Sequence, residues 1–89
     1  MARKTVVVGS SVGLHARPAA IIAEAAEKYD EDITLVIEGG DEDDEPVDAA
    51  SSLMIMTLGA EHGARVIVES DNEAAVEEIA ALVEQDLDA

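Results

Sequence analysis

The residues best suited to chemistry in this chain lie close together near its N-terminus, at His15 and Arg17. A neutral imidazole is a competent nucleophile toward an activated phosphoryl group and can hold that group as a covalent intermediate. An arginine two residues later offers a planar fork of N–H donors that matches phosphate oxygens. Pro18 comes next, and proline is tolerated in the first turn of a helix, so we expect a helix to begin near residues 16–18.

A helix that begins directly after His15 would aim its unpaired N–H groups and the positive end of its dipole at the imidazole. These groups would favour the neutral ring before transfer and would bind phosphoryl oxygens after it. Phosphoryl transfer depends mainly on positioning and charge stabilisation, which such a loop can supply. No cluster of metal ligands is visible, so we expect no metal or other cofactor in this chain, and any Mg²⁺ would have to come from a partner. The spacing alone fits an exposed loop histidine beside a solvated Arg17 equally well, and both interpretations stay open on this pattern.

Size and composition predict a single domain over residues 1–89. Hydrophobic residues make up 48% of the chain and Tyr29 is the only aromatic, so the core must be aliphatic. Without cysteine there is neither a disulfide nor a thiolate metal site. Because the sequence shows no signal-peptide pattern and no apolar run of membrane-spanning length, we expect a cytoplasmic protein that does not insert into membranes. We also expect a monomer.

The charge balance is extreme, with 21 acidic residues against five Lys and Arg and a formal net charge of -16. Nucleic acid is a poor partner for such a chain, because phosphate contacts need clustered cations. Disorder is not expected, since hydrophobicity is not low. We favour a surface adapted to high salt, where screening weakens self-repulsion. The acidic run at 41–45 is predicted to be a solvated insertion at a loop tip, because it lacks the spacing of an EF-hand cation site.

Hydrophobic periodicity predicts seven elements in the order β-α-β-β-α-β-α. They are strands at 5–8, 33–38, 46–48 (a short edge strand) and 64–69, and helices from 16–18 to 29, from 51 or 52 to 58, and after a capping box of Ser70 and Glu73. The last helix carries a core stripe of Val76, Ile79, Ala80, Val83 and Leu87. Because strands and helices alternate too irregularly for a doubly wound sheet, we predict an α+β fold with one mostly antiparallel sheet and helices on one face.

Two segments of the chain resemble the signatures of one known family. Residues 13–20, Gly-Leu-His-Ala-Arg-Pro-Ala-Ala, closely resemble the phosphorylation-site signature of HPr, the histidine-containing phosphocarrier of the phosphoenolpyruvate-dependent sugar phosphotransferase system. Residues 47–59 resemble the second signature of that family, with Ser51, Leu53, Met56, Thr57, Leu58 and Gly59. Chain length and element order also fit, so the resemblance covers nearly the whole sequence.

The resemblance implies the HPr open-faced β-sandwich, a four-stranded antiparallel sheet covered on one face by three helices. It also implies that His15 is phosphorylated on Nδ1 and that Arg17 and the backbone amide of Ala16 stabilise the phosphoryl group. Phospho-Enzyme I, charged by phosphoenolpyruvate, would be the donor. The Enzyme IIA of a sugar system, with fructose as one candidate, would be the acceptor. Such a protein is a phosphoryl relay rather than an enzyme with turnover of its own.

Ser51 aligns with the serine that a regulatory kinase phosphorylates in some members of the family, which makes a serine kinase a candidate partner. The same serine also fits the plain role of a helix N-cap, which needs no regulation. The chain departs from the family here, because Ser52, Leu53 and Met54 replace the usual Ile-Met-Gly. We therefore favour the cap.

The partner interface is expected on the short helix after Ser51, because the exposed face of this helix docks Enzyme I and Enzyme IIA in the family. Leu53 and Met54 are the candidate contacts there, together with Ala19 of the first helix. Exposed apolar patches often mark partner sites, although these residues could instead all belong to the core. Ser52, which stands in place of a hydrophobe, would weaken the contact.

Few other groups could add positive charge near the site. His62 is predicted to be a surface loop residue, since nothing near it in the sequence suggests a ligand or a base. Besides Arg17, only Arg65 or Lys4 remains for docking of the kind that relies on cations. We therefore expect docking to lean on apolar contacts and to work best at high salt.

Two rival functions remain. The same carrier chemistry could serve a dihydroxyacetone kinase or a regulatory branch instead of a sugar permease. In the second rival, the protein is a non-catalytic regulatory binding module that acts through Ser51. Acceptor assays separate the first rival from the sugar system, and tolerance of His15→Ala would favour the second.

Overall fold

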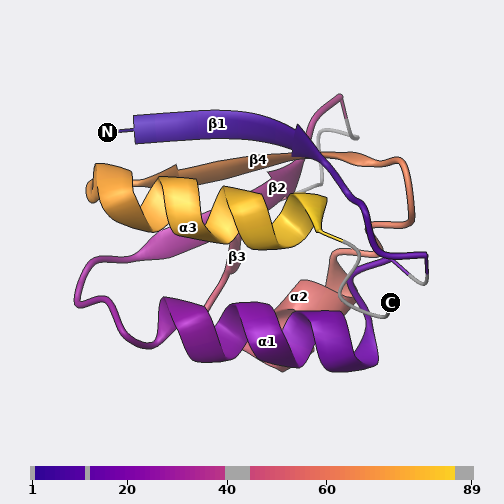
Figure 1. Cartoon of the computed structure of the whole chain (residues 1–89), viewed down its shortest axis with the longest axis horizontal. Helices are drawn as coiled ribbons and strands as arrows, with labels where there is room; N and C mark the ends of the chain where they lie inside the picture. The colour runs from indigo at the N-terminus through magenta and orange to yellow at the C-terminus, as the bar shows by residue number, and fades with distance from the viewer. Residues whose placement is uncertain (1, 12, 40–44, 86–89) are drawn as a thin grey trace.

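Runs of β-branched residues form the strands, and Ala-rich or capped runs form the helices, as the hydrophobic periods predict. The computed structural model describes residues 2–11, 13–39 and 45–85 (Figure 1). Its elements are β1 (Ala2–Val7), α1 (Ala16–Ala26), β2 (Ile33–Ile37), β3 (Val47–Asp48), α2 (Ser52–Thr57), β4 (Arg65–Ser70) and α3 (Glu73–Glu84). The predicted order β-α-β-β-α-β-α and the α+β fold class are confirmed.

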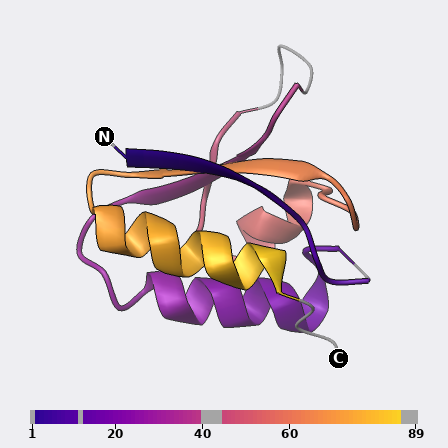
Figure 2. The ribbon, with the colours of Figure 1, turned by 45° about the horizontal axis from the view of Figure 1, so that its top comes forward.

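The strands form one antiparallel sheet in the order β1-β4-β2-β3. In its interior, Val66 of β4 faces Val6 of β1, and on the other side Val68 of β4 faces Leu35 of β2. Among the described strands β3 pairs only with β2, so the expected short edge strand is confirmed. Figure 2 shows α1, α2 and α3 together on one face of this sheet, which is the predicted open-faced arrangement.

The core between the sheet and the helices is aliphatic. Strand side chains alternate between the two faces, so Val66 and Val68 are buried whereas Arg65 is exposed. Each buried side chain of this size contributes about 1.5–3 kcal/mol to folding. The stripe predicted for α3 is buried at Val76, Ile79, Ala80 and Val83. These contacts fix the position of α3 relative to β1 and β4. They therefore also fix the loop that begins at Gly9, which contacts the C-terminal end of α3.

Strand pairing moves two element boundaries away from their predicted places. Ala2 pairs with Ser70, so β1 begins earlier than its β-branched run suggests and β4 continues through Ser70. The predicted capping box of Ser70 and Glu73 is therefore wrong, because a residue held in the sheet cannot also start the helix. The N-cap of α3 is Asn72, whose side-chain oxygen accepts a hydrogen bond from the Ala75 amide at 3.2 Å.

The first helix ends earlier than its apolar stripe predicts, at Ala26 rather than at 29. The amides of Lys28 and Tyr29 bond to carbonyls three residues back, in a tight turn that leaves the α-helical ladder. Their side chains then reach across to α3, where both donate hydrogen bonds to the carboxylate of Glu78. This contact ties the end of α1 to the middle of α3.

Three remaining expectations concern segments near the ends of the description. Of the acidic run at 41–45 only Glu45 is described, and it is exposed; the rest of the run lies outside the described residues. Leu87, expected to continue the core stripe, also lies outside them. Within the described ranges, no helix is both long and apolar enough to cross a membrane.

Candidate functional site

His15 is the N-cap residue of α1, in the place that the sequence predicts. Its backbone is extended, with φ -120° and ψ 161°, and its side chain does not cap the helix. The residue is exposed to solvent. The imidazole therefore lies at the start of α1 but does not serve as its capping group.

The loop before His15 is held against a second loop by a close backbone contact at Gly13. Gly13 has φ +76°, and a Cβ built there would lie 2.4 Å from the Ala60 carbonyl oxygen and 2.9 Å from the Cα of Glu61. The next residue, Leu14, donates its amide to the same carbonyl at 2.9 Å and buries its side chain in the core. The Gly-Leu pair of the motif thus provides close approach and an anchor for the histidine that follows.

The other end of this loop rests on the end of α3. The amide of Gly9 donates to the Val83 carbonyl at 3.0 Å, and a Cβ at Gly9 would collide with the Glu84 carbonyl oxygen, only 1.8 Å away. The hydroxyl of Ser10, a buried residue, donates to the Gln85 carbonyl at 3.2 Å. The loop is thus fixed on both sides before it reaches the histidine.

Arg17, the second residue of α1, is exposed and differs from the other cations of the chain. The other four Lys and Arg residues form ion pairs: Arg3–Glu69 at 3.4 Å, Lys4–Glu77 at 3.1 Å, Lys28–Glu78 at 2.7 Å and Arg65–Glu38 at 3.7 Å. With the residues described in the structure, Arg17 makes no ion pair. The first turn of α1 also has no acidic residue. An anion at this helix start therefore meets N–H donors and is not repelled by a carboxylate of the first turn.

His62, predicted to be a surface loop residue with no site nearby, is exposed but lies at this same site. A shallow depression of about 350 Å³ is lined by Ser11, His15, Glu61 and His62. The two histidines come from loops far apart in the sequence, so no local pattern could have paired them. The feature that connects the two loops is the close backbone contact of Gly13 with residues 60–61, which only the folded structure shows.

Ser51 is the N-cap of α2, as predicted. Its hydroxyl oxygen accepts a hydrogen bond from the Met54 amide at 3.3 Å. Gly59, with φ +69°, follows the C-cap Leu58 and takes the left-handed conformation expected of a residue that ends a helix. The short helix is therefore defined at both ends by residues of the second signature.

Of the three residues expected to contact partners, two are exposed and one is buried. Leu53 and Met54 are 73% and 44% exposed, while Ile55 beside them is buried in the core. Figures 1 and 2 show α2 beside the N-terminal half of α1, to which it packs. Ala19 is 0% exposed, because it lies on the core side of α1. Its expected contact with a partner is therefore a wrong prediction, since its side chain offers no surface.

No group of three or more His, Asp or Glu residues that could hold a metal ion occurs in the described part of the chain. The groups gathered around His15 are N–H donors, a hydroxyl and a second imidazole, together with one carboxylate, that of Glu61. Donors of this kind bind anions and can stabilise a transferred phosphoryl group.

Comparison with known proteins gives a consistent result. Residues 2–85 match the model of the family described as "PTS HPr component phosphorylation site". The chain is 41% identical to the phosphocarrier protein HPr of Streptomyces coelicolor, over 99% of this chain and 94% of that protein. It is 42% identical to the phosphocarrier protein HPr of Haloferax volcanii, over 83% of each. The solved phosphocarrier protein HPr of Bacillus anthracis has the same fold, with a TM-score of 0.80 and 32% identity over 92% of this chain and 95% of that one.

Proposed function

This chain belongs to the HPr family, the phosphocarriers of the phosphotransferase system, and we propose that His15 is the residue that carries the phosphoryl group, on its Nδ1 nitrogen. The observation that carries this proposal is an exposed imidazole at the start of α1, not used as a cap, beside an arginine without an ion pair among the described residues. The donor is phospho-Enzyme I, which is charged by phosphoenolpyruvate, and the acceptor is a sugar-specific Enzyme IIA.

Each transfer exchanges one bond to phosphorus for another. In the first, the nitrogen lone pair of His15 attacks the phosphorus of phospho-Enzyme I, and the bond from phosphorus to the donor breaks. In the second, a nucleophile of the acceptor attacks the same phosphorus, and the bond to His15 breaks. The phosphoryl group keeps its charge throughout, so the protein must supply positioning and positive charge at His15.

Arg17 and the first backbone amides of α1, at Ala16 and Arg17, supply that positive charge. Pro18 has no N–H, so these two amides are the donors that the first turn offers before the helix ladder begins. Because the chain as a whole has a formal net charge of -16, a phosphoryl group is repelled from surfaces that lack such donors. The charge pattern therefore favours this one loop as the place of phosphorylation.

Docking of Enzyme I and Enzyme IIA uses the exposed face of α2. Leu53 and Met54 present apolar surface close to the start of α1, whereas the cations Lys4 and Arg65 are engaged in ion pairs. Salts that are excluded from protein surfaces strengthen a contact built on apolar area, and salt of any kind screens repulsion between acidic surfaces. We therefore expect transfer by this cytoplasmic, monomeric carrier to be fastest at high ionic strength.

Phosphorylation by phosphoenolpyruvate and an active Enzyme I in high salt tests the proposal. The intact mass of the wild type should increase by one phosphate, which is released in acid, and His15→Ala should gain none while keeping the circular dichroism spectrum of the wild type. Arg17→Ala should still be phosphorylated, but about 10²-fold more slowly, because one positioned donor is lost. No gain by the wild type would refute the carrier function.

Acceptor assays then separate the pathways. The phosphorylated protein is offered a sugar-specific Enzyme IIA or a dihydroxyacetone kinase system, and loss of the phosphate identifies the acceptor. The binding module acting through Ser51 is the less supported alternative, because the Ser51 hydroxyl already caps α2. Normal phosphorylation of Ser51→Ala, with a modest loss of stability, would agree with the capping role.

A further inference from the structure

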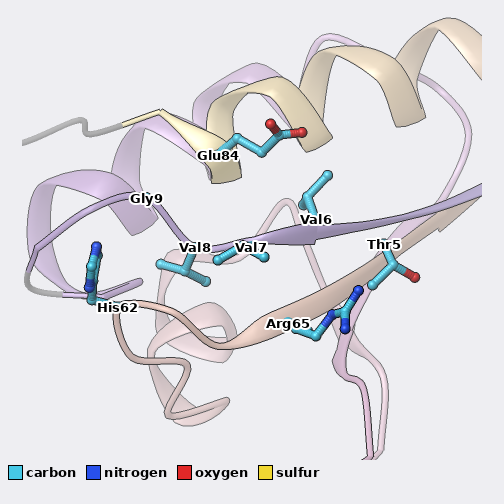
Figure 3. Close-up of a pocket in the computed structure, with 8 residues that line it drawn as sticks. All are labelled: Thr5, Val6, Val7, Val8, Gly9, His62, Arg65 and Glu84. Carbon is cyan, nitrogen blue, oxygen red and sulfur yellow. The ribbon is translucent and has the colours of Figure 1, made fainter.

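Outside the motif itself, a second histidine, His62, lies at the site of the proposed chemistry. It lines the same depression as His15, with Ser11 and Glu61 as the other lining residues, and both histidines are exposed. His62 also lines a second depression, of about 470 Å³, whose charged members are Arg65 and Glu84. Figure 3 shows the His62 ring beside the loop that leads away from Gly9 toward the motif.

The place of His62 relative to His15 is set by backbone contacts rather than by flexible side chains. The amide of Leu14 donates to the Ala60 carbonyl at 2.9 Å, and the amide of Gly63 donates to the Val8 carbonyl at 3.0 Å. These bonds join the two loops on both sides of His62, and the Gly13 contact lies between them. The two imidazoles are therefore presented to one space by the fold.

The charged groups around this depression supply little positive charge for a phosphoryl group, so a second cation would stabilise it. A phosphoryl group adds about two negative charges near neutral pH. Glu61 on the same loop and Glu84 at the end of α3 oppose those charges, and Arg65 of β4 is paired with Glu38 at 3.7 Å. Arg17 of α1 remains, and an imidazolium at position 62 would add N–H donors from the opposite loop.

We propose that His62, in its protonated form, donates a hydrogen bond to the phosphoryl group carried by His15. This inference rests on the proposed phosphorylation of His15 and adds to it a second phosphoryl-binding residue, which the motif does not contain. No covalent step is involved, because His62 takes up one proton from solvent and shares it with the phosphoryl oxygens. The phosphoryl group is then held between Arg17 on one side and His62 on the other.

Protonation of His62 and phosphorylation of His15 must then strengthen one another, because the coupling between two binding events is reciprocal. The proposed hydrogen bond would bring the two negative charges of the phosphoryl group to about 5 Å from the imidazolium, where Coulomb attraction in water favours the protonated ring about tenfold. The imidazolium stabilises the phosphorylated protein at low pH, and this stabilisation is lost as the pH rises and the ring loses its proton. A neutral substitute at position 62 should remove that pH dependence.

The direct test follows the ring of His62 by NMR in the unphosphorylated and phosphorylated protein. Phosphate is added by phosphoenolpyruvate and Enzyme I or, independently, by potassium phosphoramidate, and its attachment to His15 is verified by fragment mass spectrometry. The titration of His62 should move upward by about one pH unit on phosphorylation. An unchanged titration, or phosphate found on His62 itself, would overturn the inference.

Variants give a second readout that a merely structural role would not change. At a fixed ratio of phosphoenolpyruvate to pyruvate, His62→Gln should lower the equilibrium constant for phosphorylation about tenfold at about pH 6 and not at about pH 8.5. His62→Lys should restore the high value at both pH values, and Glu61→Gln should raise it. Equal pH profiles for the wild type and His62→Gln would refute the role of the imidazolium.

The two proposals fail in distinguishable ways. If Enzyme I does not phosphorylate the wild type, the carrier function fails, but phosphoramidate-treated protein still reports whether His62 responds to a phosphoryl group. If His15 is phosphorylated by Enzyme I and the titration of His62 does not move, only the role of His62 fails.

Discussion

Replacing Gly13 by alanine should separate the loop that carries His15 from the loop against which it rests. Gly13 has φ +76°, and the new Cβ would lie 2.4 Å from the Ala60 carbonyl oxygen. The left-handed conformation costs an alanine about 1–2 kcal/mol. The atoms that the new Cβ would meet belong to the backbone of Ala60 and Glu61, so the two loops must move apart. The hydrogen bond from the Leu14 amide to the Ala60 carbonyl is then strained or lost, which costs about 0.5–1.5 kcal/mol.

The sum predicts that Gly13→Ala lowers the free energy of unfolding by about 1.5–3.5 kcal/mol. Gly39→Ala is the matched control, because Gly39 has nearly the same φ, +74°, and none of the described residues places an atom within 4 Å of its built Cβ. The control should lose only the conformational part, about 1–2 kcal/mol. Urea unfolding at high salt measures both, with the m-value used to verify that the unfolded states are comparable.

The same pair of variants tests whether the loop contact matters for function. Gly13→Ala should slow phosphorylation by phospho-Enzyme I, because His15 and the start of α1 move together with Leu14. Gly39→Ala should transfer at the rate of the wild type. Equal losses of stability in the two variants, or normal transfer by Gly13→Ala, would refute the claim that contact with residues 60–61 positions the histidine.

Three further substitutions probe docking, acid stability and helix capping. Leu53→Ser should reduce kcat/KM for phosphorylation by Enzyme I about tenfold while changing the unfolding free energy by less than about 0.5 kcal/mol, since the side chain is exposed; a normal kcat/KM would remove Leu53 from the interface. Hydrogen bonds from Lys28 and Tyr29 lower the pKa of Glu78, so this carboxylate stabilises the fold above its unfolded pKa and the stabilisation is lost as pH falls through the lowered folded pKa. Glu78→Gln should therefore be less stable than the wild type near neutral pH in urea titrations, and the two should converge in acid; a gap that does not depend on pH would contradict the linkage. Asn72→Ala should cost about 1 kcal/mol in the same assay by removing the N-cap of α3, and an unchanged midpoint would show that the cap is dispensable.

Local sequence patterns predicted the elements well, because each depends on neighbours in the chain. The period of the final helix identified its buried face from Val76 to Val83, and Ser51 was recognised as a cap from its place before an apolar run. Errors arose where a distant strand decided the outcome. Ser70 looked like a cap in its local context, but its pairing with Ala2 keeps it in the sheet, and Asn72 takes the role.

The burial of Ala19 shows a different kind of error. Its position in the motif suggested a surface near the partners, but the side of α1 that faces the sheet depends on how the helix packs. Helical spacing gives the stripe of a helix, and a small alanine can belong to that stripe or to its edge. Only the packed structure decides between the two.

What the sequence determined by itself is which groups stand at the candidate site: an imidazole at a helix start, an arginine two residues later, and a strongly acidic chain around them. These features are local or compositional, so they can be read without the fold. What only the tertiary structure decided is which residues lie beside His15. The loop of residues 60–63 reaches it through backbone contacts between segments far apart in the chain, and those contacts bring His62 to the same depression. Such contacts leave no periodic trace in the sequence, because they depend on the pairing of β1 with β4 and on a glycine that lets two backbones touch.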